Sequence, residues 1–360
     1  MVNGLANPKG VKFDCEICGR AATLQCQLCR VTYYCTKEHQ NVDWDGIHEK
    51  ICQLLVPLRT PPLVIGSEEE RMRRQASIQM HQRALIEMTR SESIKFLAHG
   101  KFELAIPGAI QALRISVDVY GAGAIELVPA YLLLAEANLG MQRYKQAEEY
   151  LSLANWSIVK NPNCSYAVRS QLQRNSGKLY AATGKDEDAL KQLAHAVYYS
   201  SLMFGPEHVV TSGGFYQMAC VFEKKKQTEA EAQAMFEKVQ QIWNKHLRSL
   251  LIDTTSLANN SPPEPLNESQ VTEGIEMLSK VLSFRLIKGE PPEVAEAHFT
   301  VGLAQEYLND IERASDHYQK ALDITESECG SEHPRTLELK RSIARCEAFN
   351  PSRNRIAASA

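Results

Sequence analysis

Cysteine and histidine crowd into one short window near the start of the chain, CEICGRAATLQCQLCRVTYYCTKEHQNVDWDGIHEKIC, which spans residues 15–52. The window holds six of the ten cysteines and two of the ten histidines of the 360-residue chain. A Cys-x2-Cys knuckle turns the backbone so that two sulfur atoms face one point. A spacing of four residues on a helix places two side chains on one face. The eight candidate ligands form four such chelating pairs, which are Cys15 with Cys18, Cys26 with Cys29, Cys35 with His39, and His48 with Cys52.

Four chelating pairs are enough for two tetrahedral metal sites, and the mixture of thiolate and imidazole ligands favours zinc. Each site would be closed by four protein ligands, which makes it structural, because a catalytic zinc keeps one position open for water or substrate. A segment this short buries little apolar core, so zinc would supply its folding free energy, about 10–16 kcal/mol for a small module. The sequence therefore predicts two Zn2+ ions. Spacing alone leaves open whether consecutive or alternating pairs share one ion.

The composition of the whole chain limits where it works and what it binds. Forty basic residues face 43 acidic ones, for a net charge of -3, and the cysteine window itself is slightly acidic. This balance argues against nucleic-acid binding and against binding to a membrane surface. No apolar run is long enough to cross a bilayer, and the N-terminus lacks the apolar stretch of a secretory signal. We therefore expect the protein in the cytoplasm or nucleus, where thiols stay reduced and disulfides are rare.

The cysteine window resembles the MYND-type zinc finger. The resemblance is carried by the two Cys-x2-Cys knuckles, a Tyr-Tyr-Cys run, a glutamine followed four residues later by tryptophan, and the closing His-x3-Cys. It implies a cross-brace, in which alternating pairs share a metal ion. One zinc would then be held by Cys15, Cys18, Cys35 and His39, and the other by Cys26, Cys29, His48 and Cys52.

The window departs from the family pattern in two places. The imidazole of His39 stands where the family usually has a cysteine thiolate. The gap from Trp44 to His48 is one residue longer than usual, and we expect Gly46 to break the helix there and give the chain room to turn. The resemblance also implies that short proline-containing peptides bind at a groove that involves Gln40 and Trp44. An alternative role for Trp44 is to cover the small zinc core.

Proline and glycine mark the stretch after the window, residues 53–66, as a linker with short extended pieces. A long helix is predicted to follow. Ser67 is its candidate N-cap, and Glu70 lies three residues further on, as in a capping box. The helical pattern ends at Gly100, a residue that commonly stops helices.

An internal repeat with a period of about 42 residues follows. Each copy places three small or apolar residues at a spacing of four and then three, which puts them on one helical face. Alanine at these sites lets two antiparallel helices approach closely, while leucine or an aromatic residue fills the neighbouring hole. The five copies are Ala105-Ala109-Ala112, Ala147-Leu151-Ala154, Ala189-Leu193-Ala196, Ala232-Phe236-Val239 and Ala314-Tyr318-Ala321.

The helix before the repeated helix carries its own small residue, twelve positions earlier, at Ala135, Gly177 and Gly302. With this addition the pattern resembles the tetratricopeptide repeat (TPR), and its long period resembles the repeats of kinesin light chains. The resemblance implies stacked helix pairs whose concave face binds peptides or helices of partner proteins. Four polar residues are candidates for lining this face or, alternatively, for an ordinary solvated surface: Asn138, Arg174, Asn175 and Lys178.

The predicted fold is mainly α-helical: a TPR-like helical-repeat solenoid with an N-terminal two-zinc cross-brace MYND finger. Residues 271–287 are predicted to be helical, and the sequence leaves open whether they form the second helix of a missing repeat. The predicted parts are an N-terminal tail (1–14), the finger (15–52), the linker (53–66), helical repeats (67–252), a flexible loop (253–268), a C-terminal repeat with a solvent-facing capping helix (269–350) and a tail (351–360).

Sequence motifs of enzymes are missing: there is no GxSxG, P-loop or HExxH. A relation to SET-type lysine methyltransferases, some of which carry a MYND finger, is disfavoured because the chain after Cys52 lacks strand-rich segments. We expect a non-enzymatic scaffold or adaptor that binds other proteins, with no nucleic acid or membrane among its partners. The leading context is the cytoplasm and the assembly of motile cilia or sperm flagella, at the axoneme. The alternative is a nuclear transcriptional corepressor adaptor.

Overall fold

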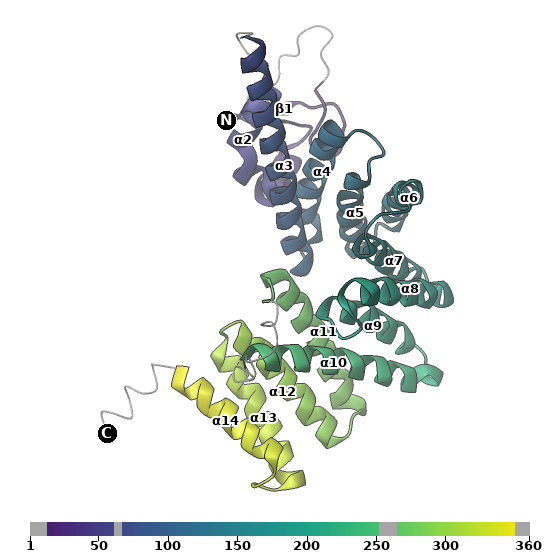
Figure 1. Ribbon diagram of the computed structural model, residues 1–360, viewed down its shortest axis with the longest axis vertical. Helices are drawn as coiled ribbons and strands as arrows, with labels where there is room; N and C mark the ends of the chain where they lie inside the picture. The colour runs from purple at the N-terminus through teal and green to yellow at the C-terminus, as the bar shows by residue number, and fades with distance from the viewer. Residues whose placement is uncertain (1–12, 61–66, 252–264, 350–360) are drawn as a thin grey trace, which may run out of the picture. The chain divides into compact units, whose positions relative to one another are not determined.

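The structure is a computed structural model, and it describes residues 13–60, 67–251 and 265–349. Within these ranges the chain is almost entirely helical, apart from a two-stranded sheet near the start (Figure 1). The chain divides into two compact units, Met1–Lys185 and Asp186–Ala360. None of the helices in the described ranges combines the length and the apolar composition that a membrane span needs.

The first unit contains the short sheet and seven α-helices within its described residues. A π-helical turn, Trp44–His48, joins the first two of these helices, and a 3-10 turn, Ile125–Leu127, leads into the fifth. The elements are β1 (Leu24–Gln25), β2 (Tyr33–Tyr34), α1 (Lys37–Asp43), α2 (Glu49–Arg59), α3 (Glu68–Ala98), α4 (Phe102–Tyr120), α5 (Val128–Gly140), α6 (Tyr144–Lys160) and α7 (Tyr166–Ala182).

All regular secondary structure in the described residues of the second unit is helical. A 3-10 turn, Lys226–Thr228, leads into its third helix. The helices are α8 (Asp186–Phe204), α9 (Val209–Phe222), α10 (Glu229–Leu251), α11 (Glu268–Lys288), α12 (Pro291–Tyr307), α13 (Ile311–Cys329) and α14 (Pro334–Phe349).

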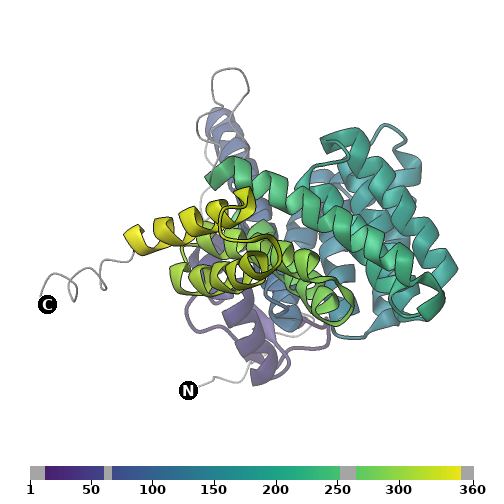
Figure 2. The same cartoon turned by 90° about the horizontal axis from the view of Figure 1, so that it is seen from below.

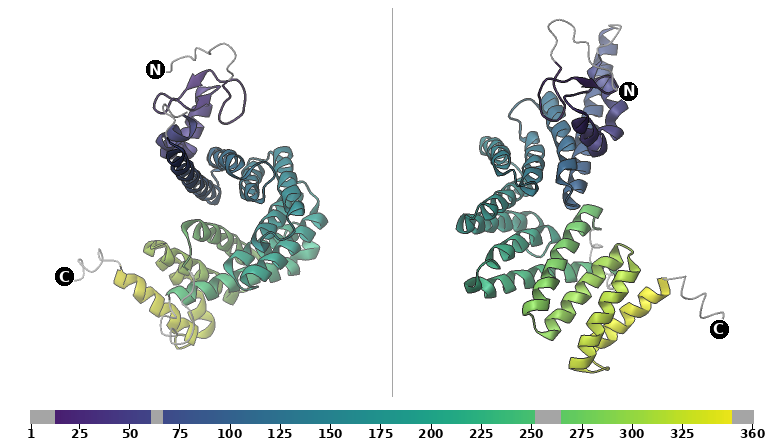
Figure 3. Two further views of the ribbon diagram at one scale, coloured as in Figure 1. Left: turned by 45° about the horizontal axis from the view of Figure 1, so that its top comes forward. Right: turned by 180° about the vertical axis from the view of Figure 1, so that it is seen from behind.

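Consecutive helices pack side by side in both units. In the first unit α3 packs on α4, and α5 packs on α6, as the two views of Figure 3 show. In the second unit α9 packs on both α8 and α10, and α12 packs on α13, which is followed by α14 (Figure 2). Helix pairs of this kind confirm the predicted helical-repeat fold class.

The repeated residues are the centres of these helix contacts. All fifteen positions of the five sequence copies are buried, with at most 5% of their surface exposed. In one copy the structure explains why the preceding helix carries a small residue. A Cβ atom added at Gly302 would lie 2.5 Å from the ring of Tyr318. Close packing between antiparallel helices therefore explains both the small and the large member of the pattern.

The predicted N-terminal cap of the long helix is confirmed. The backbone N–H of Glu70 donates to the Ser67 hydroxyl at 3.3 Å, and the N–H of Ser67 donates to the Glu70 carboxylate at 3.0 Å. Helix α3 then runs to Ala98, and Gly100 beyond it has a φ of +67°, a conformation that favours glycine.

Helix α11 packs on α10 and α12 without a paired helix of its own in the described residues. Asn267 caps it, in a capping box with Gln270. Its close contact with α10 depends on Gly274, because a Cβ atom there would lie 2.3 Å from the indole ring of Trp243. The helix predicted over residues 271–287 is therefore a single helix inserted between two helix pairs.

The linker prediction is wrong for residues 53–59, which continue helix α2 to Arg59. Helix forms here because Leu55 is buried, with 1% of its surface exposed, in a cluster with Ile47 and Ile51. Pro57 is tolerated close to the helix end. The remainder of the linker, 61–66, lies outside the described residues, as do 1–12 of the predicted tail, 253–264 of the predicted loop, residue 252 before it and the tail 351–360.

Candidate metal centres and interaction faces

The two knuckles of the finger are tight turns set by a few backbone hydrogen bonds. The N–H of Gly19 donates to the carbonyl of Cys15 at 3.0 Å, and Gly19 has a φ of +67°. The N–H of Arg30 donates to the carbonyl of Cys26 at 3.1 Å, and Arg30 has a φ of +60°. Strand β1, which connects the two knuckles, pairs in antiparallel register with β2, which lies between the second knuckle and helix α1. The turns therefore present each pair of thiols on one side of the backbone.

The first cluster combines Cys15, Cys18, Cys35 and His39, whose ligand atoms all lie within 4.8 Å of one another. The Sγ atoms of Cys18 and Cys35 are 3.6 Å apart. Nδ1 of His39 lies 3.5 Å from Sγ of Cys15 and 3.3 Å from Sγ of Cys35, so this nitrogen faces the centre of the cluster.

The second cluster combines Cys26, Cys29, His48 and Cys52, again with all ligand atoms within 4.8 Å of one another. All four residues are buried. Here the other imidazole nitrogen faces the thiols, because Nε2 of His48 lies 3.6 Å from Sγ of Cys29. The Sγ atoms of Cys26 and Cys52 are 4.0 Å apart.

A carboxylate stands behind the histidine of the second cluster. Oδ2 of Asp43 lies 3.7 Å from Nδ1 of His48 and accepts a hydrogen bond from the hydroxyl of Tyr34 at 2.6 Å. Burial raises the pKa of Asp43 to about 6. At 3.7 Å this carboxylate is a charged neighbour of the imidazole rather than its hydrogen-bond acceptor, and Nδ1 of His48 has no hydrogen-bond partner within the described residues. The sequence analysis missed Asp43, although its position five residues before His48 on a helical stretch could have suggested it.

The thiols of the two clusters differ in acidity, because burial, hydrogen bonds and neighbouring thiols act differently on each one. Burial opposes ionisation of Cys18, but hydrogen bonds from Arg20 outweigh it and lower the pKa of this thiol to about 6. Burial and the neighbouring thiols raise the pKa of Cys35 to about 11 and that of Cys52 to about 12. Thiolate is the form that binds a metal, and a divalent cation removes the repulsion between such closely spaced anions. The two donor sets therefore fit two zinc ions.

The structure brings together alternating pairs rather than consecutive ones. Each cluster contains the four residues that the resemblance to MYND fingers groups on one metal. Ligation of zinc by these atoms follows as a proposal from their identity and spacing.

The expectation that Gly46 breaks the helix is wrong. Residues 44–48 form a π-helical turn, so α1 and α2 form one continuous helical segment. A π turn takes up one extra residue without ending the helix, which accounts for the longer gap between Trp44 and His48. Glycine is needed for a different reason: a Cβ atom at Gly46 would lie 2.8 Å from the carbonyl oxygen of Leu104 and 2.9 Å from Cγ of Pro107 in helix α4.

The finger is attached to the first helix pair by a buried carboxylate. Glu16 lies between two candidate ligands in sequence, and 6% of its side chain is exposed. It accepts hydrogen bonds from Arg59 of α2 at 2.5 Å and from Gln111 of α4 at 2.9 Å, and it also pairs with Arg114 of α4. Arg59 donates to the carbonyl of Val31 at 3.0 Å. The finger, α2 and α4 are therefore one packed body, and the sequence analysis did not identify this network.

The predicted peptide-binding residues of the finger, Gln40 and Trp44, lie one turn apart at the end of α1, and both are half-buried. The indole ring of Trp44 packs edge-on against His48, with ring centres 5.7 Å apart. Trp44 thus covers part of the second cluster and keeps part of its surface exposed, so both roles considered for it are compatible with its position.

Two of the four residues predicted to line a concave face are buried instead. Asn138 donates to the carbonyl of Leu134 at 2.7 Å, and Asn175 donates to the carbonyl of Leu132 at 3.2 Å. Their exposed fractions are 5% and 0%. The prediction is wrong for these residues, because both side chains are buried between helices and their amide groups donate to backbone carbonyls.

The other two residues, Arg174 and Lys178, are half-buried around one carboxylate. Lys178 donates to Glu136 at 2.6 Å. Burial opposes ionisation of Glu136, but the charges of Lys178 and Arg174 outweigh it and lower its pKa. These side chains join α5 to α7, and a contact with a partner protein remains a prediction for both.

Comparison with known proteins agrees with the two modules. Residues 15–52 match the MYND finger family, and residues 295–328 match the tetratricopeptide repeat family. Programmed cell death protein 2 of Rattus norvegicus is 42% identical over 38 residues, which cover 11% of this chain and 11% of that protein. Egl nine homolog 1 of Homo sapiens is 48% identical over 40 residues, which cover 11% of this chain and 9% of that protein. The chain thus matches about a tenth of the length of these curated relatives.

Among solved structures, a Podosopora anserina kinesin light chain with nearly identical TPR-like repeats aligns with 70% of this chain and 98% of its own, at 15% identity and a TM-score of 0.35. The apo form of RapI aligns with 73% of this chain and 71% of its own, at 12% identity and a TM-score of 0.29. Likeness this distant carries no argument, so the repeat fold rests on the family match and on the chain's own helix pairs. The chain carries an N-terminal MYND zinc finger with two clusters suited to zinc, and a tetratricopeptide repeat close to its C-terminus.

Proposed function

We propose that the protein is a non-enzymatic adaptor that holds other proteins together. One observation carries the proposal: the chain combines a MYND finger with a tetratricopeptide repeat, and modules of both kinds generally mediate protein–protein interactions. The metal clusters support it, because four protein ligands for each ion leave no open position for a water or a substrate.

The finger is the part whose partner chemistry can be stated. We propose that it takes up proline-containing peptides at the face formed by Gln40 and Trp44. The support is that Trp44 is partly exposed and rests against His48, so an aromatic surface is held in place by the second cluster. Proline rings pack well on aromatic side chains, as in other modules that bind proline-rich segments. Peptide binding at this face would therefore depend on zinc.

A panel of fluorescein-labelled decapeptides with and without proline tests this function by fluorescence polarisation. The substitution Trp44→Ala is expected to weaken binding of the proline-containing peptides at least tenfold without loss of zinc. Trp156→Ala is the matched control, because Trp156 is 60% exposed and lies on α6, away from the finger. Equal binding by the two variants would contradict the proposed peptide face, and a Gln40→Ala variant provides a second test if Trp44→Ala loses its metal.

The cellular context is a separate proposal. We propose that the adaptor works in the cytoplasm during assembly of motile cilia or sperm flagella, with the axoneme as the destination of its clients. Proximity labelling with the full chain in ciliated cells is expected to mark cytoskeletal motor and axonemal proteins. Labelling confined to chromatin proteins would favour the rival function, a nuclear transcriptional corepressor adaptor.

A further inference from the structure

The two candidate zinc clusters differ in how far solvent reaches their sulfur atoms. In the second cluster all four residues are buried, and each of its three cysteines exposes at most 6% of its surface. In the first cluster only Cys15 is buried, whereas Cys35 is half-buried and Cys18 is exposed. A small reagent that arrives from solvent and reacts with thiolates therefore reaches the first cluster more readily than the second.

The surroundings of Cys18 are those of a reactive cysteine. Nε of Arg20 donates to Sγ of Cys18 at 3.4 Å, and both residues are exposed. A neighbouring guanidinium stabilises the anionic form of sulfur, which is the nucleophile, and reactive cysteines lie in partially exposed sites of positive charge. In the second cluster, by contrast, Sγ of Cys29 lies in a buried site, 3.2 Å from the hydroxyl of Thr32 and 3.6 Å from Nε2 of His48.

A second thiol lies within reach of Cys18. The Sγ atoms of Cys18 and Cys35 are 3.6 Å apart. A disulfide bond is about 2.05 Å long, so the two atoms need to approach by about 1.5 Å to form one. Cys18 belongs to the first knuckle and Cys35 to the turn between β2 and α1, so neither residue lies inside a helix or strand. The approach therefore requires no regular element to break.

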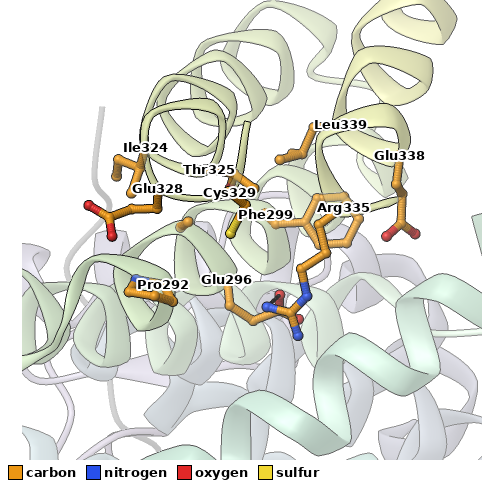
Figure 4. A pocket seen from close by; sticks show the side chains of 11 residues that line it. Pro292, Glu296, Phe299, Ile324, Thr325, Glu328, Cys329, Arg335, Glu338 and Leu339 are labelled. Carbon is orange, nitrogen blue, oxygen red and sulfur yellow. Dashed lines mark ion pairs between the residues drawn. The ribbon is translucent and has the colours of Figure 1, made fainter. Parts of the chain in front are cut away.

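Exposure without a neighbouring thiol occurs elsewhere in the chain and provides a comparison. Among the cysteines, Cys329 at the end of α13 is the other exposed one. Its sulfur faces a small pocket whose wall includes Phe299 of α12 and Leu339 of α14, and no second cysteine lines this pocket (Figure 4). A reagent can reach Cys329, but a disulfide with a neighbour cannot form there.

We propose that Cys18 and Cys35 form a site of reversible oxidation by hydrogen peroxide, at which their conversion to a disulfide releases the zinc ion of the first cluster and leaves the second cluster intact. The inference rests on zinc binding by the first cluster and is independent of the adaptor function. It gives the exposed cluster a role that the buried one cannot have.

The chemistry of the site balances with peroxide as the oxidant. The Cys18 thiolate attacks one peroxide oxygen, the O–O bond breaks, and Cys18 becomes a sulfenic acid while the departing hydroxide takes a proton from solvent to form water. The Cys35 thiolate then attacks the Cys18 sulfur, the S–O bond breaks, and the second hydroxide leaves as water in the same way. Peroxide gains the two electrons that the two thiolates lose. Two of the four protein ligands of the ion are lost, and its charge is unchanged.

Peroxide treatment of the full chain, loaded with two zinc ions, tests the site. After catalase has removed the peroxide, released zinc is measured with a chromogenic chelator, and free thiols are alkylated before digestion and mass spectrometry. Trypsin places Cys18 in the peptide 13–20 and Cys35 in the peptide 31–37, so the proposed disulfide joins these two peptides. Fragment spectra distinguish a bond to Cys18 from one to Cys15, which lies in the same peptide.

The wild type is expected to release one zinc ion per chain at least tenfold faster than the other, together with the bond between Cys18 and Cys35. Arg20→Gln keeps every zinc ligand and removes the neighbouring cation, so it should slow this release at least threefold. Cys329→Ser is the matched control, because it removes the other exposed thiol, and it should leave the rate unchanged. A thiol reductant with added zinc should restore two ions per chain.

Loss of both zinc ions at one rate would overturn the inference, because solvent access would then not distinguish the clusters. A disulfide confined to the peptide 13–20 would overturn the pairing of Cys18 with Cys35. Oxidation of Cys329 while both zinc ions stay bound would show that the first cluster is protected, and would refute the site as well.

Discussion

Removing the charge of Glu16 should loosen the finger and the first helix pair together. The substitution Glu16→Gln keeps the size of the side chain but withdraws the anion that faces Arg59 and Arg114 and accepts from Gln111. Two arginines are then left facing each other without a counter-charge. Because the three partners come from α2 and α4, the loss acts on the contact between finger and helices and leaves the candidate zinc ligands in place.

The size of the effect follows from burial. Removing one partner of a fully buried ion pair costs about 3–5 kcal/mol. Here the carboxylate is buried, but 27% of the Arg59 side chain and 38% of the Arg114 side chain are exposed, so water can hydrate both after the change. This hydration reduces the penalty. We therefore expect the free energy of opening the contact between the finger and the helices to fall by about 2–3 kcal/mol. That loss corresponds to a 30- to 150-fold faster exchange, at about 1.4 kcal/mol for each factor of ten.

Hydrogen exchange with mass spectrometry measures this directly. In Glu16→Gln, amides of α2 and α4 should lose protection by the same factor, because the two helices open together. Glu69→Gln is the matched control, since its ion pair with Arg73 is 3.8 Å long with both side chains more than 80% exposed, and it should cost less than about 0.5 kcal/mol. A Glu16→Gln effect no larger than that of Glu69→Gln, or one confined to α2, would refute the reasoning.

Three further predictions follow from particular contacts. Gly46→Ala should lower the stability of the first unit by about 1–3 kcal/mol, because the new methyl group meets α4 at 2.8 Å; thermal unfolding with no shift would contradict this. Gly302→Ala should destabilise the second unit by a similar amount through the ring of Tyr318, whereas Gly302→Ala combined with Tyr318→Leu should recover part of the loss in urea unfolding. Burial and the neighbouring His317 lower the pKa of His298 from 6.5 to about 4, so the unfolded state binds more protons between these values. Stability should therefore fall as pH drops from about 6.5 to 4, by about 2 kcal/mol at pH 5, and His298→Phe should remove much of this dependence; an unchanged dependence would reject the assignment.

Local spacing in the sequence predicted the parts of the fold that depend on neighbours along the chain. The alanine positions at intervals of four and three are buried because a helix returns the same face to its partner at that spacing. The capping box at Ser67 and Glu70 needs only four consecutive residues, and it forms as predicted. Each chelating pair of the finger also depends only on neighbouring residues, so its spacing could be recognised in the sequence. Which two pairs share a cluster depends on how distant pairs meet, and spacing alone did not predict it.

Features that depend on contacts between distant segments could not be predicted from the sequence. Glu16 contacts Arg114, which lies 98 positions further along the chain, and no local sequence pattern around either residue predicts this contact. Gly46 looked like a helix breaker, whereas the approach of α4 requires glycine inside a continuous helix. Asn175 was predicted to line a concave binding face or, alternatively, a solvated surface, yet it is buried and donates to the backbone of a neighbouring helix 43 positions earlier. In each case the partner segment, rather than the local sequence, decides the role of the residue.

The arrangement of the metal ligands is tested most directly by zinc X-ray absorption on the variant Cys15→Ser with Cys18→Ser. With alternating pairs on each ion, the intact site of this variant is Cys26, Cys29, His48 and Cys52. The account predicts one zinc per chain with three sulfur atoms near about 2.3 Å and one nitrogen near about 2.0–2.1 Å. One zinc bound by two sulfur and two nitrogen atoms would show that consecutive pairs share the metal, and a chain that folds without zinc would contradict the structural role of both sites.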